Sequence, residues 1–224
     1  CYCRVSMCDA LSDTYVATCD KEIFHYIESI DGKVVMTSDS HERASDRAAE
    51  AMLKIEEISG KKTDVLVMVQ GDEPMDTPEM ISEALAPMLE NDSVQVVNLM
   101  GRIANLAEFE DPNTVKVVVG PDANAIYFSR EPIPSRWKGF EDAPMLKQIC
   151  IIPFRRDYLL RFNSTPETPL ERIESVDMLR VIESGDQVRM VMTESASIGV
   201  DTELELKTVS TLMQDDPLMR EYLS

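Results

Sequence analysis

Polar and apolar positions alternate along the first half of the chain in two distinct patterns. Short apolar runs rich in β-branched residues predict strands at 15–18, 33–37, 65–69 and 94–100. Between them, apolar residues recur at helical spacing, which predicts helices that begin near Asp20, His41 and Thr77. Strands that alternate with helices at short intervals indicate an α/β fold with a doubly wound, mostly parallel sheet.

The second half of the chain follows a different pattern. Residues 115–119 and 125–128 predict a hairpin, and the proline-rich segment 130–155, which contains Trp137, is interpreted as an excursion from the main sheet with a returning strand at 148–152. A capping box at Thr168 opens a helix that Gly185 can close. A last strand at 188–192 and a final helix capped by Thr202 complete one predicted domain over 1–224.

Two aspartates follow glycines near predicted strand ends. Val65–Val69 is an unbroken apolar run, typical of a strand buried on both faces in the middle of a parallel sheet, and Asp72 comes directly after Gly71. Open α/β sheets bind ligands at this carboxyl edge, although a simple Asx turn would explain Asp72 equally well. Asp201 precedes the helix cap Thr202. Together Asp72 and Asp201 could hold one Mg²⁺, which takes few carboxylates and keeps water and phosphate as its other ligands.

Composition narrows the class of protein. The 224 residues are 44% hydrophobic and 28% charged, and 41 acidic against 22 basic residues give a net charge of −19. Such an excess of negative charge opposes binding to nucleic acid or to anionic membranes. Because no apolar run approaches the ~20 residues that span a bilayer, a cytoplasmic protein is expected. Five cysteines predict free thiols rather than a disulfide framework.

Ordered motifs carry a resemblance to a known family. They are Gln70-Gly71-Asp72-Glu73-Pro74-Met75, Asp111-Pro112-Asn113-Thr114-Val115-Lys116, Tyr127-Phe128-Ser129-Arg130-Glu131-Pro132, Pro169-Leu170-Glu171 with Leu179-Arg180, and Gly199-Val200-Asp201-Thr202. In their order and spacing the sequence resembles the CMP-Kdo synthetases, which are 3-deoxy-manno-octulosonate (Kdo) cytidylyltransferases. The resemblance extends from the start of the chain to about Leu212. It implies a sheet of the nucleotide-diphospho-sugar transferase type.

The resemblance also implies a reaction. CTP and a 3-deoxy-ulosonic acid would give the CMP-sugar and pyrophosphate for surface polysaccharide or lipopolysaccharide synthesis. The anomeric hydroxyl would attack the α-phosphorus while Mg²⁺ stabilises charge on the phosphoryl oxygens. By the family's pattern Asp72 and Asp201 are the metal ligands, and Gln70 lies at the sugar.

Three arginines are candidate binding residues for the anionic substrates. The fork of Arg130 suits a sugar carboxylate, although a structural ion pair is an open alternative. Arg43 and Arg47 lie four residues apart at the start of a predicted helix, where backbone donors favour anions. We expect Arg43, Ser45 and Arg47 near the nucleotide, and the alternative is a solvated charged face.

The predicted sugar pocket departs from the family's pattern. Gln148, Ile152 and Met178 stand where relatives carry histidine, tyrosine and glutamine, while Gln148 and Asp177 remain candidate sugar contacts. A buried polar site that loses partners discriminates between substrates, so the acceptor is expected to differ from ordinary Kdo or to meet an altered pocket. A legionaminic- or pseudaminic-type acid is an alternative acceptor. Compensation by neighbours such as Asp177 would leave Kdo as the substrate.

The family begins with a strand and a cationic nucleotide loop that have no counterpart in this sequence. About 25 residues are therefore expected upstream of Cys1. If this loop were absent, a non-catalytic nucleotide-sugar binding protein would be the alternative. A homodimer is predicted through 130–155, because the strand Ile149–Ile152 is apolar on both faces, and Trp137 and Phe140 could form an exposed apolar patch.

Overall fold

The structure, a computed structural model, describes residues 1–138, 143–195 and 197–222. The helices are α1 Tyr2–Ser6, α2 Lys21–Ser29, α3 Ala44–Ser59, α4 Pro78–Glu90, α5 Leu106–Glu110, α6 Arg156–Ser164, α7 Pro169–Glu174, α8 Met178–Glu183, α9 Glu203–Gln214 and α10 Pro217–Tyr222. The strands are β1 Val16–Thr18, β2 Val34–Met36, β3 Val65–Val69, β4 Val97–Arg102, β5 Lys116–Val119, β6 Ala125–Ser129, β7 Leu146–Ile149, β8 Ile151–Arg155 and β9 Arg189–Met192.

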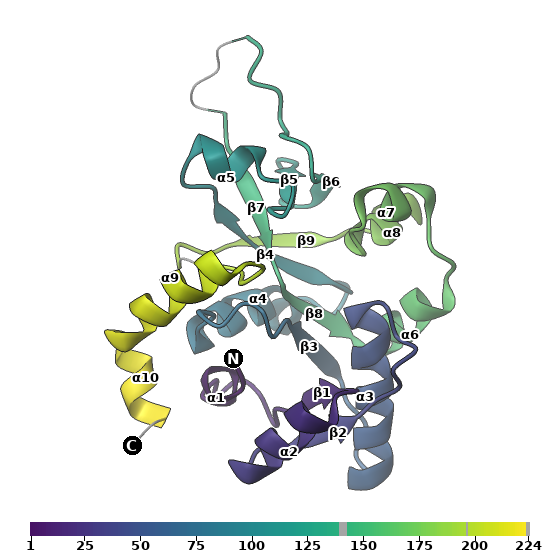
Figure 1. Ribbon diagram of the computed structural model, residues 1–224. Coiled ribbons are helices and arrows are strands. Elements are labelled where there is room, and N and C mark those ends of the chain that lie inside the picture. The colour runs from purple at the N-terminus through teal and green to yellow at the C-terminus, as the bar shows by residue number, and fades with distance from the viewer. Residues whose placement is uncertain (139–142, 196, 223–224) are drawn as a thin grey trace.

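One long antiparallel strand connects the parts of the sheet. β7 and β8 follow each other directly and are separated only by Cys150. β8 pairs antiparallel with β3, and β7 pairs antiparallel with β4, which in turn pairs parallel with β9. The β5–β6 hairpin adds to the other edge of β7, while β1 and β2 form a separate parallel pair (Figure 1).

The α/β class is confirmed, but the sheet is mixed rather than mostly parallel. The expected place of Val65–Val69 in the middle of a parallel sheet is wrong. Within the described residues β8 is the strand that pairs with β3, and it runs antiparallel; Met68 is the one buried residue of β3, and its other four residues are partly exposed. The apolar run predicted a strand correctly, whereas the direction of its neighbour depended on residues more than eighty positions away.

Two hydrophobic clusters lie on opposite faces of the sheet. One includes Phe154, Leu159 and Met178 and is covered by α3, α6 and α8. The other includes Met80 and Ile151 and is covered by α1 and α4. Because successive side chains of a strand point to opposite faces, β3, β4, β7, β8 and β9 each contribute to both clusters.

Local sequence signals placed most helix starts correctly. The side chain of Asp20 caps α2, Thr77 caps α4, and capping boxes open α7 and α9. The single helix expected after Thr168 is two helices, because Ser175 adopts a left-handed conformation with φ 53° and breaks it. The sequence interpretation did not include α6, although its apolar residues have helical spacing.

The predicted excursion is shorter than 130–155. Residues 130–138 and 143–145 belong to a loop that extends beyond the sheet (Figure 1), whereas 146–155 form β7 and β8 within it. Ile149 and Ile152 are both buried in this chain's own clusters, so the expectation that a partner must cover a second apolar face is wrong. Trp137 remains 85% exposed, and Phe140 lies outside the described residues. Within the described ranges, no helix is long and apolar enough to span a bilayer.

A buried ion pair joins α7 to α8. Glu171 is fully buried, and its carboxylate accepts two hydrogen bonds from the guanidinium of Arg180. Arg180 also donates to the carbonyls of Phe162 and Thr165 and lies 4.3 Å from the centre of the Phe162 ring. The pair therefore fixes both short helices against α6.

We expect Arg180→Met to lower the free energy of unfolding by about 3–5 kcal/mol, because Glu171 would keep a buried charge without a partner. Urea unfolding followed by circular dichroism measures this loss. The matched control is Arg161→Met, which removes an exposed pair with Asp186 and should cost about 1 kcal/mol or less. Equal losses in the two variants would contradict the role given to the buried pair.

Candidate active site

Two turns bring Asp72 and Asp201 to the same edge of the sheet. The first turn follows β3, and the second precedes α9. The backbone N–H of Val200 donates to the carbonyl of Asp72 at 2.9 Å, which joins the turns directly. The backbone N–H of Asp201 donates to the carboxylate of Glu205 at 2.8 Å, so the α9 capping box also holds Asp201 in place.

Negative charge is concentrated around Asp201. Partial desolvation raises the pKa of its carboxyl, and the charges of Asp72, Glu205 and Asp111 raise it further, while Arg130 opposes them. Carboxylates that raise the pKa of a neighbour hold uncompensated charge, which a bound cation would relieve. Within the described part of the chain, no group of three or more ligating side chains is assembled. The hydrogen bond between Val200 and Asp72 makes Asp72 and Asp201 the candidate pair of carboxylates at this edge.

A buried lysine holds the neighbouring turn. Lys116 is fully buried, and its ammonium donates to the carbonyls of Asp111 and Thr114 at 2.8 Å and to the carbonyl of Arg130. Burial lowers the pKa of Lys116, although nearby Asp111 opposes the shift. Because one ammonium binds both segments, the positions of Asp111 and Arg130 depend on each other.

Arg130 binds carbonyl oxygens rather than carboxylates. Its guanidinium donates to the carbonyls of Glu174 at 2.7 Å, Pro112 at 2.9 Å and Ser175 at 3.4 Å. The carboxylate of Glu174 accepts instead from the backbone N–H of Arg130 and from the hydroxyls of Ser129 and Tyr127. Within the described residues Arg130 forms no ion pair, so its positive charge is held in position without being neutralised.

Ser45, Arg43 and Asp177 form a second polar group at the start of α3. The hydroxyl of Ser45 donates to the Asp177 carboxylate at 2.8 Å, and Ser45 is fully buried. Arg43 lies 3.3 Å from the same carboxylate and 3.0 Å from that of Glu167. Burial raises the pKa of Asp177, although Ser45 and Arg43 oppose the shift. The structure therefore brings these three predicted site residues together as a link between α3 and α8.

Arg47 points to a different segment from Arg43. Its guanidinium donates to the Thr37 hydroxyl at 2.6 Å and to the carbonyls of Ser38 and His41 at 3.2 and 3.3 Å. The two arginines therefore do not form a common helical face. Arg47 organises the β2–α3 loop, while Arg43 contacts the break between α7 and α8.

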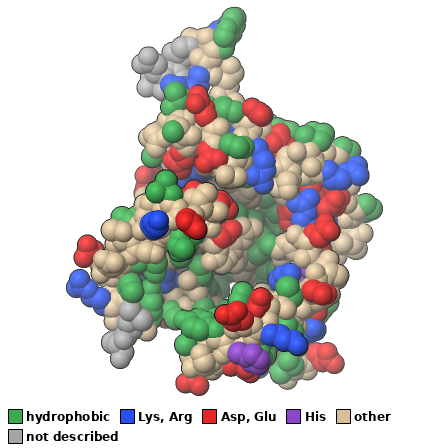
Figure 2. Space-filling view, in the orientation of Figure 1, with side chains coloured by type: hydrophobic (Ala, Val, Ile, Leu, Met, Phe, Trp, Pro, Cys, Tyr) green, Lys and Arg blue, Asp and Glu red, His purple; other side chains and the backbone are tan. Residues whose placement is uncertain are grey.

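Ser175 contacts both polar groups, the one that contains Arg130 beside Asp201 and the one formed by Ser45, Arg43 and Asp177. Its carbonyl accepts from Arg130, and its hydroxyl accepts from Arg43 at 3.4 Å. The left-handed residue between α7 and α8 thus connects the surroundings of Asp201 with those of Asp177. Figure 2 shows that this face of the molecule is hollowed at its centre, between α9 and the α7–α8 segment.

The predicted sugar residues have different environments. The backbone N–H of Gln70 donates to the carbonyl of Cys150 at 3.3 Å, which ties the Asp72 turn to the junction of β7 and β8. Gln148 is partly buried and donates from Nε2 to Asn98 at 2.6 Å. Ile152 and Met178 are 3% and 0% exposed and belong to the core. Of the three replaced positions, only Gln148 therefore offers polar atoms to a ligand.

Sequence reasoning missed a buried acidic group beneath the Asp72 turn. The Glu73 carboxylate accepts from the backbone N–H of Cys150 at 3.0 Å, and the Ser197 hydroxyl lies 2.9 Å from Glu73 and 3.1 Å from Asp76. The hydroxyl has one proton to share between these two acids, so a proton on one acid would give both of them a full hydrogen bond to Ser197. Burial and the charge of Glu73 raise the pKa of Asp76 to about 8. The signal in the sequence that could have indicated this group is the presence of three acids, Asp72, Glu73 and Asp76, within five residues.

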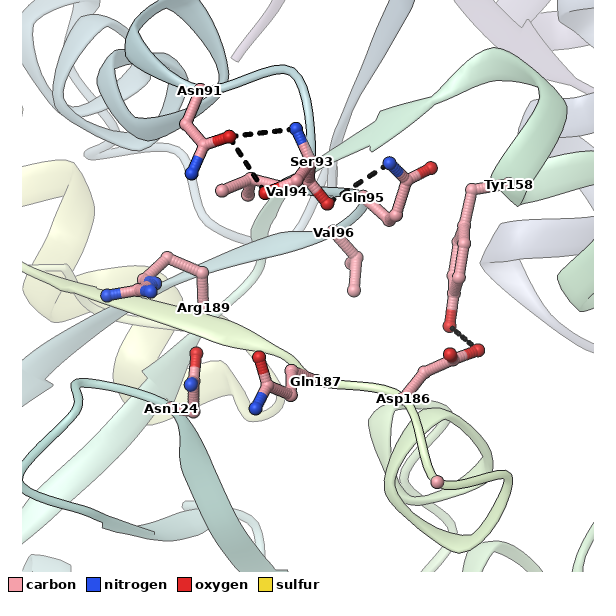
Figure 3. A pocket seen from close by; sticks show the side chains of 11 residues that line it. Asn91, Ser93, Val94, Gln95, Val96, Asn124, Tyr158, Asp186, Gln187 and Arg189 are labelled. Atoms are coloured by element: carbon pink, nitrogen blue, oxygen red, sulfur yellow. Dashed lines mark hydrogen bonds between the residues drawn. The ribbon is translucent and has the colours of Figure 1, made fainter.

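A further pocket lies at the opposite edge of the sheet, where β4 and β9 begin. It has a volume of about 290 Å³, and Tyr158, Asp186, Gln187, Asn124 and Arg189 are among the residues that line it (Figure 3). The candidate site lies at the carboxyl ends of the parallel strands, where sheets of this kind bind ligands, whereas this pocket lies at the amino ends of β4 and β9. The two are therefore separate. None of the predicted site residues lines it.

Asp76 should make the stability of the protein depend on pH. Because its folded pKa is raised, the native state keeps a proton that the unfolded state loses, and the free energy of unfolding falls as the pH rises from about 4 to about 8. We expect Asp76→Asn to remove about 1 kcal/mol per pH unit of this fall, as measured by urea unfolding at pH 5, 6.5 and 8. The exposed control Asp9→Asn should keep the wild-type slope, and an unchanged slope in Asp76→Asn would contradict the buried proton.

Comparison with known proteins gives one consistent result. The cytidylyltransferase family matches residues 1–195. The chain is 38% identical to a 3-deoxy-manno-octulosonate cytidylyltransferase of Geobacter metallireducens, over 93% of this chain and 84% of that protein, and 36% identical to one of Geotalea daltonii, over 96% and 86%.

A solved structure supports the same relationship. The chain is similar, with a TM-score of 0.86 and 35% identity over 95% of this chain and 85% of the other, to a CMP:2-keto-3-deoxy-manno-octonic acid synthetase complexed with CTP. A 4-diphosphocytidyl-2C-methyl-D-erythritol synthase from Anaerococcus prevotii, with a TM-score of 0.59 at 14% identity over 94% and 85%, shares the fold alone. The chain therefore belongs to the cytidylyltransferase family.

Proposed function

We propose that this chain transfers CMP from CTP to Kdo, a 3-deoxy-ulosonic acid, and releases pyrophosphate. The observation that carries the proposal is the hydrogen bond between Val200 and Asp72, which brings the two aspartates of the predicted metal site to one edge of the sheet. The similarity to a synthetase solved with CTP supports the nucleotide, and the names of the relatives support the acceptor. CTP and the sugar acid are thus the proposed partners.

Asp72 and Asp201 are the residues that would hold Mg²⁺. Two carboxylates at one edge, one of them with its pKa raised by the other, fit a cation that takes one or two carboxylates and completes its octahedron with water and phosphate oxygens. When bound, Mg²⁺ would neutralise charge on the phosphoryl oxygens. The protein's own part is to hold both carboxylates in place through the Asp72 carbonyl and the α9 capping box.

Positioned positive charge would complete the site. Arg130 is fixed by carbonyls and keeps its charge, so it can face the carboxylate of a sugar acid. Arg47 is held in the same way beside the start of α3, where an anionic nucleotide would meet both its guanidinium and the helix N-terminus. Phosphoryl transfer depends on such positioning more than on covalent help from the protein.

We expect Asp72→Asn and Asp201→Asn each to reduce kcat/KM for CTP at least about a hundredfold. Loss of either carboxylate would weaken binding of Mg²⁺, and with it the positive charge that the ion would place beside the phosphates. Pyrophosphate release from CTP and Kdo with Mg²⁺ measures the effect. The free energies of unfolding of both variants should stay within about 0.5 kcal/mol of wild type, since Asp72 and Asp201 are both exposed on their turns. Asp9→Asn is the control, and full activity in either site variant would refute the assignment.

We further propose a homodimer that forms through the loop around Trp137. A tryptophan that is 85% exposed on a loop containing Pro132 and Pro134 is a rigid apolar surface of the kind that interfaces use. Sedimentation at about 10 µM is expected to give a dimer, and Trp137→Ser should raise the dissociation constant about tenfold or more. Ile126→Ser, at another exposed apolar residue, is the control. A wild-type monomer at this concentration would contradict the proposal.

A further inference from the structure

The hydrogen bonds of Asn98 in β4 determine which atom of its side-chain amide is the nitrogen and which is the oxygen. It is fully buried, and its Nδ2 donates to the carbonyls of Leu99 and Ile149, each at 2.8 Å. An amide nitrogen has two hydrogens, so both are used. The remaining oxygen, Oδ1, can only accept, and the group beside it is Nε2 of Gln148 at 2.6 Å. A flipped Asn98 would place its oxygen against two carbonyls, which excludes that orientation.

The orientation of Asn98 determines that of Gln148. Because Asn98 presents an acceptor, Gln148 must direct its NH₂ group toward Asn98 and its carbonyl oxygen Oε1 away from it. A flipped Gln148 would bring two amide oxygens to 2.6 Å. Within the described residues Oε1 of Gln148 accepts no hydrogen bond, and the side chain is only partly buried. Oε1 of Gln148 is therefore a hydrogen-bond acceptor that has no partner among the described residues.

The position of Gln148 places this acceptor at the candidate site. Its backbone N–H donates to the carbonyl of Val115 at 2.9 Å, next to the turn that holds Asp111. Two residues later, Cys150 bonds to Gln70 and Glu73 on the Asp72 turn. Gln148 thus lies between the two turns that surround Asp201. Its partner Asn98 lies two residues from both Val96 and Met100 along the chain, so its side chain is on the same face of the sheet as theirs. Val96 and Met100 belong to the cluster covered by α3 and α8, and the pair is therefore on the sheet face that carries Asp177.

We propose that Asn98 is a positioning residue that holds Gln148 with its carbonyl oxygen toward the acceptor substrate, so that the acceptor must present a hydrogen-bond donor there. The donor is a hydroxyl or an amide N–H. A hydrogen atom, an ether oxygen or a methoxy group at that position of the sugar acid would be disfavoured. The inference rests on the proposed transfer of CMP to a sugar acid and adds a rule for which acids are accepted.

The size of the effect follows from one hydrogen bond to a neutral acceptor. Loss of such a bond lowers affinity about fivefold to tenfold. Replacement of the donor by an ether oxygen costs more, because two acceptors would then face each other. Ile152 and Met178 are buried in the core, so neither can replace the lost contact.

The test uses Gln148→Met, which keeps the length of the side chain and removes its polarity. Specificity constants are measured by pyrophosphate release, with CTP saturating, for Kdo and for Kdo analogues that each lack one hydroxyl. Wild type should discriminate against one analogue by about fivefold to tenfold, and Gln148→Met should lose that discrimination while its KM for CTP stays within twofold. The matched control is Gln187→Met, in the remote pocket of Figure 3, which should behave as wild type.

Asn98 is tested through its dependence on Gln148. Asn98→Ala should lower kcat/KM for Kdo in the wild-type background and leave it unchanged in the Gln148→Met background, whereas its effect on unfolding should be similar in both. A structural role alone would lower activity in both backgrounds. Undiminished discrimination in Gln148→Met, or equal losses from Asn98→Ala in both backgrounds, would overturn this inference alone. Failure of the wild-type chain to release pyrophosphate with any sugar acid would overturn the proposed function as well.

Discussion

The antiparallel strand formed by β7 and β8 is the element on which the rest of the structure depends. It pairs with β3, β4 and β5, and the residue between its halves, Cys150, binds the Asp72 turn through both its N–H and its carbonyl. The same strand carries Gln148, and Lys147 donates from it to the carbonyl of Ser197 at 3.0 Å. Because this strand bonds the Asp72 turn, Val115 and Ser197, an error in its register would displace these three segments together.

Charge is the second constraint on this site. The chain has a net charge of −19, yet both proposed substrates are anions. Arg130 and Arg47 are fixed by carbonyl and hydroxyl oxygens, so they keep their positive charge, whereas Arg43 and Arg180 are paired with carboxylates. An arginine that is held by neutral acceptors can bind an anion without first breaking an ion pair with a carboxylate. This difference separates the arginines suited to substrates from those that stabilise the fold.

Local signals in the sequence were sufficient for the features that depend on near neighbours. Asp20 and Thr77 cap helices because their side chains bond to N–H groups two or three residues away. The meeting of Asp72 with the Asp201 turn could also be anticipated, since both follow strands that end at one edge. The break at Ser175 and the mixed strand directions could not, because each depends on contacts between segments distant in sequence.

Burial was the other quantity that the residue types alone did not reveal. Ser45 was expected at the nucleotide, but it is fully buried and its hydroxyl bonds Asp177, so its contribution is to fix α3 against α8. The sequence alone predicts that Gln148, Ile152 and Met178 are three changes in one sugar pocket, yet Ile152 and Met178 are core residues. A replacement in the core alters packing, whereas a replacement at Gln148 alters the pattern of donors and acceptors. The proposed selection of the acceptor therefore rests on the amide of Gln148, whose orientation is set by its hydrogen bond to Asn98.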